Sequence, residues 1–136
     1  MPNTLPTKLA FVDIETTGSR LRHDRIIEIG IVRVEDDQVV KTFQSLINPQ
    51  QVLSSEIVQL TNILPSDLEM APSFWEIAGE ITEVLEGCIF VAHNVRFDYS
   101  FIKEEFRRLE QSFASKQLCT VKLSRSLFPE IGRAHV

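Results

Sequence analysis

The pair Asp13 and Glu15 is the feature of this sequence that most directly suggests chemistry. The two acids follow an apolar run, and side chains alternate along a strand, so both carboxylates are expected to project from the same face. Neighbouring carboxylates repel each other and raise each other's pKa unless a positive charge lies between them. A divalent metal ion bound by both side chains is the simplest arrangement that satisfies this pattern.

A second chemical cluster runs from His93 to Asp98 and begins where the apolar run Ile89–Ala92 ends. Ligands of open α/β sheets collect at such strand ends, so Asp98 is a candidate third metal ligand. Taken alone, Asp98 could instead favour the positive end of a helix dipole. His93 could be an ordinary structural histidine and Asn94 a turn or cap residue. The presence of the first acidic pair favours metal binding.

The elements that must position these residues follow from hydrophobic periodicity and from turn and cap residues. We expect strands over Lys8–Asp13, Arg25–Val34 and Gln38–Ile47, the last two joined as a hairpin. These strands, together with the helices and strands that follow them in the sequence, predict one α/β domain whose mixed sheet carries helices on its faces. The later elements are a helix over Ser54–Leu60, a loop with Asn62, Pro65 and Ser66, a helix between Ser73 and Gly87, a strand over Ile89–Ala92, a helix from Phe97 to Leu109, a strand over Leu118–Thr120 and a helix over Val121–Leu127. On the helix from Phe97, the side expected to face solvent carries Lys103, Glu104, Glu105, Arg107 and Arg108.

Length and charge limit the possible classes of protein. With 136 residues, 43% of them hydrophobic, the chain can bury one ordinary core. A net charge of −5 argues against a broad basic face for nucleic acid, although ions held in an acidic pocket would still admit a phosphodiester. No apolar stretch approaches the roughly 20 residues of a membrane span, and the first residues lack a secretory signal. We therefore expect a cytoplasmic protein without a membrane partner, and reduced thiols without chemistry at Cys88 and Cys119.

Three ordered segments of the sequence resemble the DEDD exonuclease superfamily: Val12–Gly18, Ile26–Gly30 and Ala92–Asp98. The resemblance runs from about Lys8 to Glu130 and is closest to the DEDDh-type, epsilon-subunit-like proofreading exonucleases of bacterial DNA polymerase III. It implies an RNase H-like fold, a mixed sheet flanked by helices. It also implies metal-dependent 3′-to-5′ removal of nucleoside 5′-monophosphates from DNA, as in replication proofreading or repair, with two Mg²⁺ or Mn²⁺ ions as cofactors.

The resemblance also implies roles for individual residues. Asp13 would bridge the two ions, Glu15 would bind one of them and Asp98 would anchor the second. Phe97 and Ile63 would pack near the sugar and base of the terminal nucleotide, although either could be a core residue instead. The full set expected to contact substrate is Thr16, Thr17, Gly18, Ile63, His93, Asn94 and Phe97. Glu28, which interrupts an apolar strand, is explained as well by a salt bridge or an exposed position as by function.

The family's last motif is missing from this sequence. Family members place a His, the general base, five positions before a fourth metal-binding Asp, well beyond the equivalent of Glu130. His135 is followed by a single residue, so it cannot be that base. Residues 131–136 are the translation of ATCGGAAGAGCACACGTC, the start of a widely used sequencing-library adapter. We therefore expect an exonuclease domain over residues 1–130 that lacks its C-terminal helix, a non-native tail over 131–136, and little or no activity in this fragment.

The expected partner is a single-stranded 3′ end of DNA or RNA, with a DNA polymerase subunit or a fused downstream domain as the protein partner. Two alternatives stay open. A 3′-5′ exoribonuclease of the same superfamily is one, because nothing in the sequence clearly reads a 2′-hydroxyl. The other is a non-catalytic nucleic-acid or polymerase-binding module, which would show no Mn²⁺ titration and no degradation.

Overall fold

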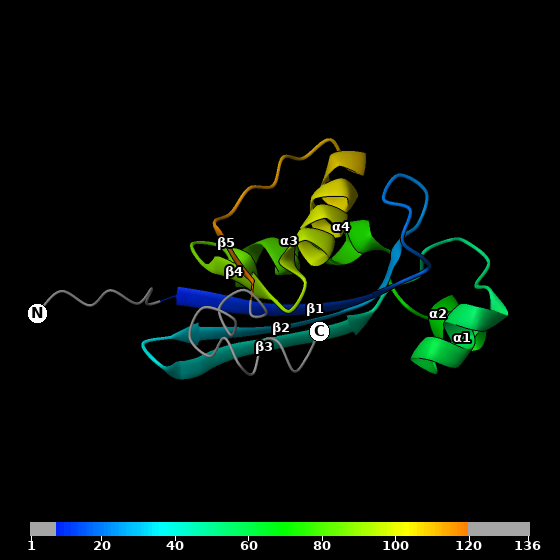
Figure 1. Cartoon of the computed structure of the whole chain (residues 1–136), viewed down its shortest axis with the longest axis horizontal. Helices are drawn as coiled ribbons and strands as arrows, with labels where there is room; N and C mark the ends of the chain where they lie inside the picture. The colour runs from blue at the N-terminus through cyan, green and yellow to red at the C-terminus, as the bar shows by residue number, and fades with distance from the viewer. Residues whose placement is uncertain (1–7, 120–136) are drawn as a thin grey trace, which may run out of the picture.

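The structure, a computed structural model, describes residues 8–119 of the chain. In that part, five strands form one sheet in the order β3-β2-β1-β4-β5, with β1 at its centre (Figure 1). The strands are β1, Lys8–Thr16; β2, Ile26–Glu35; β3, Gln38–Leu46; β4, Ile89–Ala92; and β5, Gln117–Cys119. Strand β2 is antiparallel to both β1 and β3, whereas β4 and β5 run parallel to β1, so the sheet is mixed as predicted.

The central strand β1 is paired unequally on its two sides. It pairs with β2 along its whole length, from Lys8 to Thr16, but with β4 only over Leu9–Phe11. The C-terminal half of β1 therefore has no strand on the β4 side. Asp13 and Glu15 lie on that half of the strand.

Two amphipathic helices cover one face of the sheet. Helix α3, Phe74–Leu85, and helix α4, Val95–Arg108, lie on the same side of it (Figure 1). Their buried faces meet in the core, where the rings of Phe74 and Phe106 pack edge to face at 5.2 Å. No helix within residues 8–119 has the length and apolar content needed to cross a bilayer.

Two short helices lie beyond one end of the sheet (Figure 1). Helix α1, Ser55–Thr61, begins after its N-cap Ser54, whose side chain accepts a hydrogen bond from the Ile57 amide, so the predicted helix is confirmed. Helix α2, Pro65–Glu69, replaces part of the predicted loop, and that prediction is wrong. Pro65 suits the first position of a helix, and the Asp67 carboxylate accepts a hydrogen bond from the Leu64 amide at 3.0 Å.

The other predicted elements are present with small shifts of their ends. The largest shift is in β1, which runs three residues beyond Asp13, so both acids of the first pair lie inside the strand. The strand predicted over Ile89–Ala92 has those bounds. The helix predicted over Val121–Leu127, the end of the last strand at Thr120 and the tail over 131–136 lie outside the described residues.

The prediction that the solvent-facing side of α4 includes Glu104 and Glu105 is wrong. Glu104 and Glu105 are only 7% and 1% exposed. Glu104 pairs with Arg107 on the same helix, but Glu105 pairs with Arg25, which is 80 positions away in the sequence. Paired carboxylates can be buried where isolated ones cannot, because the partner's charge offsets the loss of water.

Candidate active site

Asp13 and Glu15 lie on the same face of β1, as the predicted alternation requires. Val12, Ile14 and Thr16 are buried at 5%, 7% and 8% exposure, whereas Asp13 is exposed and Glu15 is half-buried. The apolar positions fix which face of the strand turns to the core. The two acids are therefore held on the outer face of the central strand.

A third acid on this face comes from β2. The register pairs Glu15 with Glu28, and such cross-strand partners lie side by side on one face. Asp13, Glu15 and Glu28 line a common hollow of about 100 Å³. Gln44 on β3 also lines it and donates a hydrogen bond to Glu28 at 3.3 Å. The sequence did not assign Glu28 to the site, and the signal that could have done so is the pairing register of β1 and β2.

Asp98 reaches the same region from the first turn of α4. Asp98 is 7% exposed, and its carboxyl group lies beside the backbone of Ile14, on the half of β1 that β4 leaves unpaired. Burial, followed by the charge of Asp13, raises the pKa of Asp98 to about 6. The amides of Asp98 and Ile14 act in the opposite direction, and the charge of Glu15 adds to the rise. The structure therefore brings the three predicted acids to one place.

No ion pair among the described residues neutralises the cluster. Burial raises the pKa of Glu15, and the charges of Asp13 and Glu28 raise it further. No ion pair found within residues 8–119 includes Asp13, Glu15, Glu28 or Asp98. Repulsion between these carboxylates is therefore unrelieved in this part of the chain.

The donor chemistry of the cluster suits a divalent cation. Hard ions such as Mg²⁺ take carboxylate oxygens at about 2.0–2.1 Å, and Mn²⁺ prefers the same class of ligand. Within residues 8–119, however, no group of three or more His, Cys, Asp or Glu side chains is arranged so that it could hold a metal ion. The pKa shifts of these acids do not conflict with this absence. Charges affect each other's pKa across about 4–6 Å, which is much longer than a metal–oxygen bond. The acids present fit such an ion by their donor chemistry, although they are not arranged as a metal site in this part of the chain.

The predicted nucleotide-contacting residues Thr16, Thr17 and Gly18 continue directly from the acids into a tight turn. The Thr16 hydroxyl donates to the Gly18 carbonyl at 2.6 Å, and the Thr17 hydroxyl donates to the Asp24 carboxylate at 3.1 Å. A Cβ atom on Gly18 would lie 2.5 Å from Oδ2 of Asp24, so only glycine fits there without displacement. The turn is thus shaped by a buried carboxylate that the sequence reading did not identify.

The other predicted contact residues differ in their surroundings. Ile63 is buried at 7% exposure in a small second core, while Phe97 is half-buried with its ring 4.7 Å from that of Phe101. His93 and Asn94 are exposed at the start of α4, and Asn94 is its N-cap residue. His93 shares a groove of about 660 Å³ with Asp13. Contact between any of these residues and a nucleotide stays a prediction.

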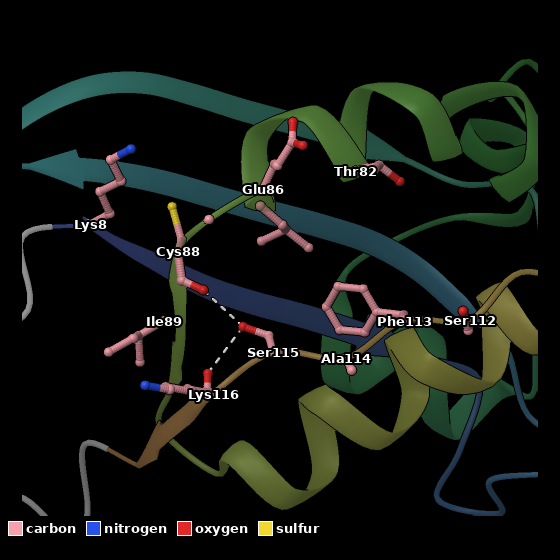
Figure 2. Close-up of a pocket in the computed structure, with 12 residues that line it drawn as sticks. Lys8, Thr82, Glu86, Cys88, Ile89, Ser112, Phe113, Ala114, Ser115 and Lys116 are labelled. Carbon is pink, nitrogen blue, oxygen red and sulfur yellow. Dashed lines mark hydrogen bonds between the residues drawn. The ribbon is translucent and has the colours of Figure 1, made fainter.

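A separate cavity of about 670 Å³ lies at the opposite ends of the strands from the acids (Figure 2). It is lined by Lys8 and Ile89, the first residues of β1 and β4, and by Cys88. The Ser115 hydroxyl closes one wall by donating to the Cys88 carbonyl at 2.8 Å. Burial raises the pKa of the Cys88 thiol, which keeps it protonated and unreactive. With Glu86 as the one acid among its lining residues, this cavity offers no set of metal ligands.

Comparison with known sequences places the chain among exonucleases. The RNase_T exonuclease family model matches residues 10–135. A 3′-5′ exonuclease DinG of Staphylococcus saprophyticus is 41% identical over 135 residues, which cover 93% of this chain and 15% of that protein. A DNA polymerase III of PolC type from Caldanaerobacter subterraneus is 38% identical over 128 residues, covering 94% of this chain and 9% of that protein. The chain thus spans only a small part of these relatives.

Solved structures show the same fold. Product-bound exonuclease I superposes with a TM-score of 0.81 at 19% identity, over 93% of this chain and 33% of that one. Escherichia coli exonuclease I in complex with a dT13 oligonucleotide gives a TM-score of 0.80 at 20% identity, over 92% of this chain and 31% of that one. At such identities the likeness concerns the fold, and it confirms the expected RNase H-like arrangement.

Proposed function

This chain belongs to the RNase_T exonuclease family, and from that premise we propose that its complete domain removes nucleoside 5′-monophosphates from the 3′ end of a single DNA strand. The observation that carries the proposal is the group of Asp13, Glu15 and Asp98. These acids come from two different elements, share one edge of the central strand and have no cationic partner in the described part of the chain. A cluster with this cost to stability is typical of a site that binds cations.

The three acids would hold Mg²⁺ or Mn²⁺, and Asp13 is the acid whose charge acts on both of the others. When bound, a pair of such ions activates a water molecule and stabilises the attacking and leaving oxygens of a phosphodiester. The protein's own part is to fix the ligands. Asp13 and Glu15 are oriented by the strand alternation, and Asp98 by the amides of α4 and Ile14.

The turn at Thr17 and Gly18 would hold the terminal nucleotide next to these acids. It follows Glu15 without a break, and Gly18 in it is half-buried beside the Asp24 carboxylate. The half-buried ring of Phe97 lies one residue before Asp98 and would pack on the sugar or base. Apolar contact of this kind accepts every base, because each base has an apolar face.

The test is to measure nucleotide release by the full-length protein that contains this domain. The substrate is a 5′-labelled single-stranded DNA oligonucleotide, with RNA of the same sequence in parallel. Asp13→Asn and Glu15→Gln remove one candidate ligand each, and we expect each to lower the rate by roughly 10²–10³-fold, the usual cost of losing an electrostatic contact to the reacting group. Glu80→Gln, on the exposed side of α3, is the matched control and should leave the rate unchanged.

The outcomes separate the candidate functions. Stepwise shortening of DNA from the 3′ end that depends on Asp13 supports the proposal, and a preference for the RNA strand would replace it with an exoribonuclease. Unchanged activity in Asp13→Asn would refute the site. A wild-type protein that binds the oligonucleotide and never shortens it would point to a binding module.

A further inference from the structure

Glu105 is a buried carboxylate that the proposed reaction does not use. It lies in the last part of α4 and is 1% exposed. Its oxygens accept three hydrogen bonds from the Arg25 guanidinium, at 2.7, 3.0 and 3.1 Å, and a fourth from the Ile26 amide at 3.1 Å. A second guanidinium, that of Arg108, lies 3.4 Å away. So many contacts on one carboxylate hold it in a single geometry.

The partners of Glu105 form the base of the β1–β2 loop, residues 17–25. The backbone of Thr17 pairs with Arg25, because the Thr17 amide donates to the Arg25 carbonyl at 2.9 Å and the Arg25 amide donates to the Thr17 hydroxyl at 2.9 Å. Arg108 also donates to the carbonyls of Leu21 and Asp24, at 3.2 and 3.4 Å. The C-terminal end of α4 therefore holds the middle and the C-terminal end of this loop directly, and Thr17 at its other end is held through Arg25.

A second buried carboxylate makes the loop itself stiff. Asp24 is 6% exposed and accepts hydrogen bonds from the Thr17 hydroxyl and from the Arg20 amide, the latter at 2.8 Å. Because Asp24 fills the space beside Gly18, the loop has little freedom to change shape. A displacement at its base would therefore move the whole turn at Thr17 and Gly18.

Helix α4 connects the contacts that Glu105 and Arg108 make with the β1–β2 loop, here called the fastening, to the candidate site. Glu105 follows Asp98 by about two helical turns, so both side chains project from the same face of α4. One end of that face places Asp98 beside β1, and the other end places Glu105 against the loop that follows β1. The helix thus acts as a rigid spacer between a candidate ligand and the nucleotide-contacting turn.

We propose that Glu105 is a positioning residue, which holds the β1–β2 loop at a fixed place relative to Asp98. Resting on the function proposed above, the inference says that this fastening aligns the 3′-terminal nucleotide with the acids. The proposed role of Glu105 is to align bound substrate rather than to bind it. Loss of the fastening should therefore slow the chemical step more than it weakens strand binding.

The experiment compares two neighbouring glutamates in the full-length protein. Glu105→Gln keeps the shape of the side chain and removes its charge. Glu104→Gln is the matched control, because Glu104 is also buried on α4 but its hydrogen-bonded ion pair is with Arg107 of the same helix, and Arg108 lies farther from it, at 3.9 Å. We expect Glu105→Gln to lower kcat by roughly 10–100-fold through misplacement of the scissile bond, with KM nearly unchanged. Glu104→Gln should leave both constants close to the wild-type values.

A fluorescent base reports alignment without turnover. With Ca²⁺ in place of Mg²⁺, an oligonucleotide carrying 2-aminopurine at its 3′ end should become brighter on Glu105→Gln than on the wild type, since the terminal base is held less firmly. The same probe placed several nucleotides upstream should not change. If Glu105→Gln does not fold, Arg25→Lys decides, because lysine keeps the charge but lacks the planar fork that reaches both carboxylate oxygens. It should lower kcat in the same direction by a smaller factor.

Three outcomes would overturn the proposal. The first is a folded Glu105→Gln whose kcat and terminal-probe signal match the wild type, and the second is an equal loss of kcat in Glu104→Gln. The third is an Arg25→Lys protein that is fully active. A wild-type protein that releases no nucleotide would instead refute the proposed function itself, and this result is distinct from the other three.

Discussion

Asp98 is the residue at which the demands of folding and of the proposed function conflict most clearly. Its pKa of about 6, against an ordinary value of 3.8, means that the folded chain holds this proton more tightly than the unfolded chain. Between about pH 4 and pH 6 the folded state therefore binds more protons, and stability falls as the pH rises. Above that window the whole cost of the buried charge is present. Cation binding by the charged form of Asp98 would explain why the protein has a residue that lowers its folding stability.

The first prediction concerns removal of this charge. In EDTA, Asp98→Asn should unfold at a higher temperature than the wild type at pH 7, with a gain on the order of 1–3 kcal/mol. The gain should shrink as the pH falls from 6 and vanish near pH 4, where the wild-type carboxyl group is itself neutral. Thermal unfolding followed by circular dichroism between pH 4 and 8 measures this. Glu80→Gln should show no such trend, and an Asp98→Asn protein less stable at every pH would contradict the account.

At the scale of elements, the β1–β2 loop depends on close contact between Gly18 and the Asp24 carboxylate. Burial alone would raise the pKa of Asp24, but hydrogen bonds from the Arg20 amide and the Thr17 hydroxyl outweigh it and hold the pKa below its usual value. The ionised carboxylate is thus part of the loop's structure. Any group that pushes it aside breaks hydrogen bonds in a buried place, which is costly.

The second prediction tests this contact with two glycines. Gly18→Ala should destabilise the protein by roughly 1–3 kcal/mol, because its Cβ would overlap Oδ2 of Asp24. Gly79→Ala is the control, since Gly79 lies inside α3 with no neighbouring atom within 4 Å. Alanine is the better helix former, so this change should stabilise by up to about 1 kcal/mol. Denaturant titration of both variants and of the wild type gives their free energies of unfolding. A Gly18→Ala protein as stable as the wild type would show that the loop can shift to accept the added methyl group.

Elements with local signals could be predicted from the sequence. Ser73 precedes α3 and the carboxylate of Glu76 accepts from its amide, while Gly87, with φ of 75°, follows the helix. These features lie within a few residues of the boundary that they define. Helix α2 was missed because five residues with one buried side chain, Leu68, show no measurable period.

The site could be predicted only in part, for a related reason. Asp13 and Glu15 are two positions apart on one strand, so alternation alone places them together. Glu28 joins them only through the register of two strands, and Glu105 is buried only because Arg25, 80 positions away, meets it. Contacts between distant segments leave no periodic trace in a sequence. The residues that position the site were therefore harder to find than the candidate ligands.

At the scale of the whole molecule, the distribution of charge matters more than its sum. The chain has a net charge of −5. The basic side chains that lie near acids in residues 8–119 are used in pairs such as Arg25 with Glu105 and Arg33 with Glu35. The acids at the edge of β1 are left without such partners in that part of the chain. The fold thus keeps a local negative potential at the place where the proposed substrate, itself an anion, must bind.

The last prediction follows from this imbalance. A divalent ion that binds the folded state relieves the repulsion between the acids, so Mn²⁺ should raise the unfolding temperature of the wild type. Binding at 100 times the dissociation constant would add about 2.7 kcal/mol. Asp13→Asn removes the central ligand and should lose most of this gain, although its own stability without metal should be equal or higher. NaCl at the same ionic strength is the control, because salt screens exposed charges without occupying a site. An equal rise in wild type and Asp13→Asn would mean that Mn²⁺ acts elsewhere, and the acids would then need another explanation for their burial and proximity.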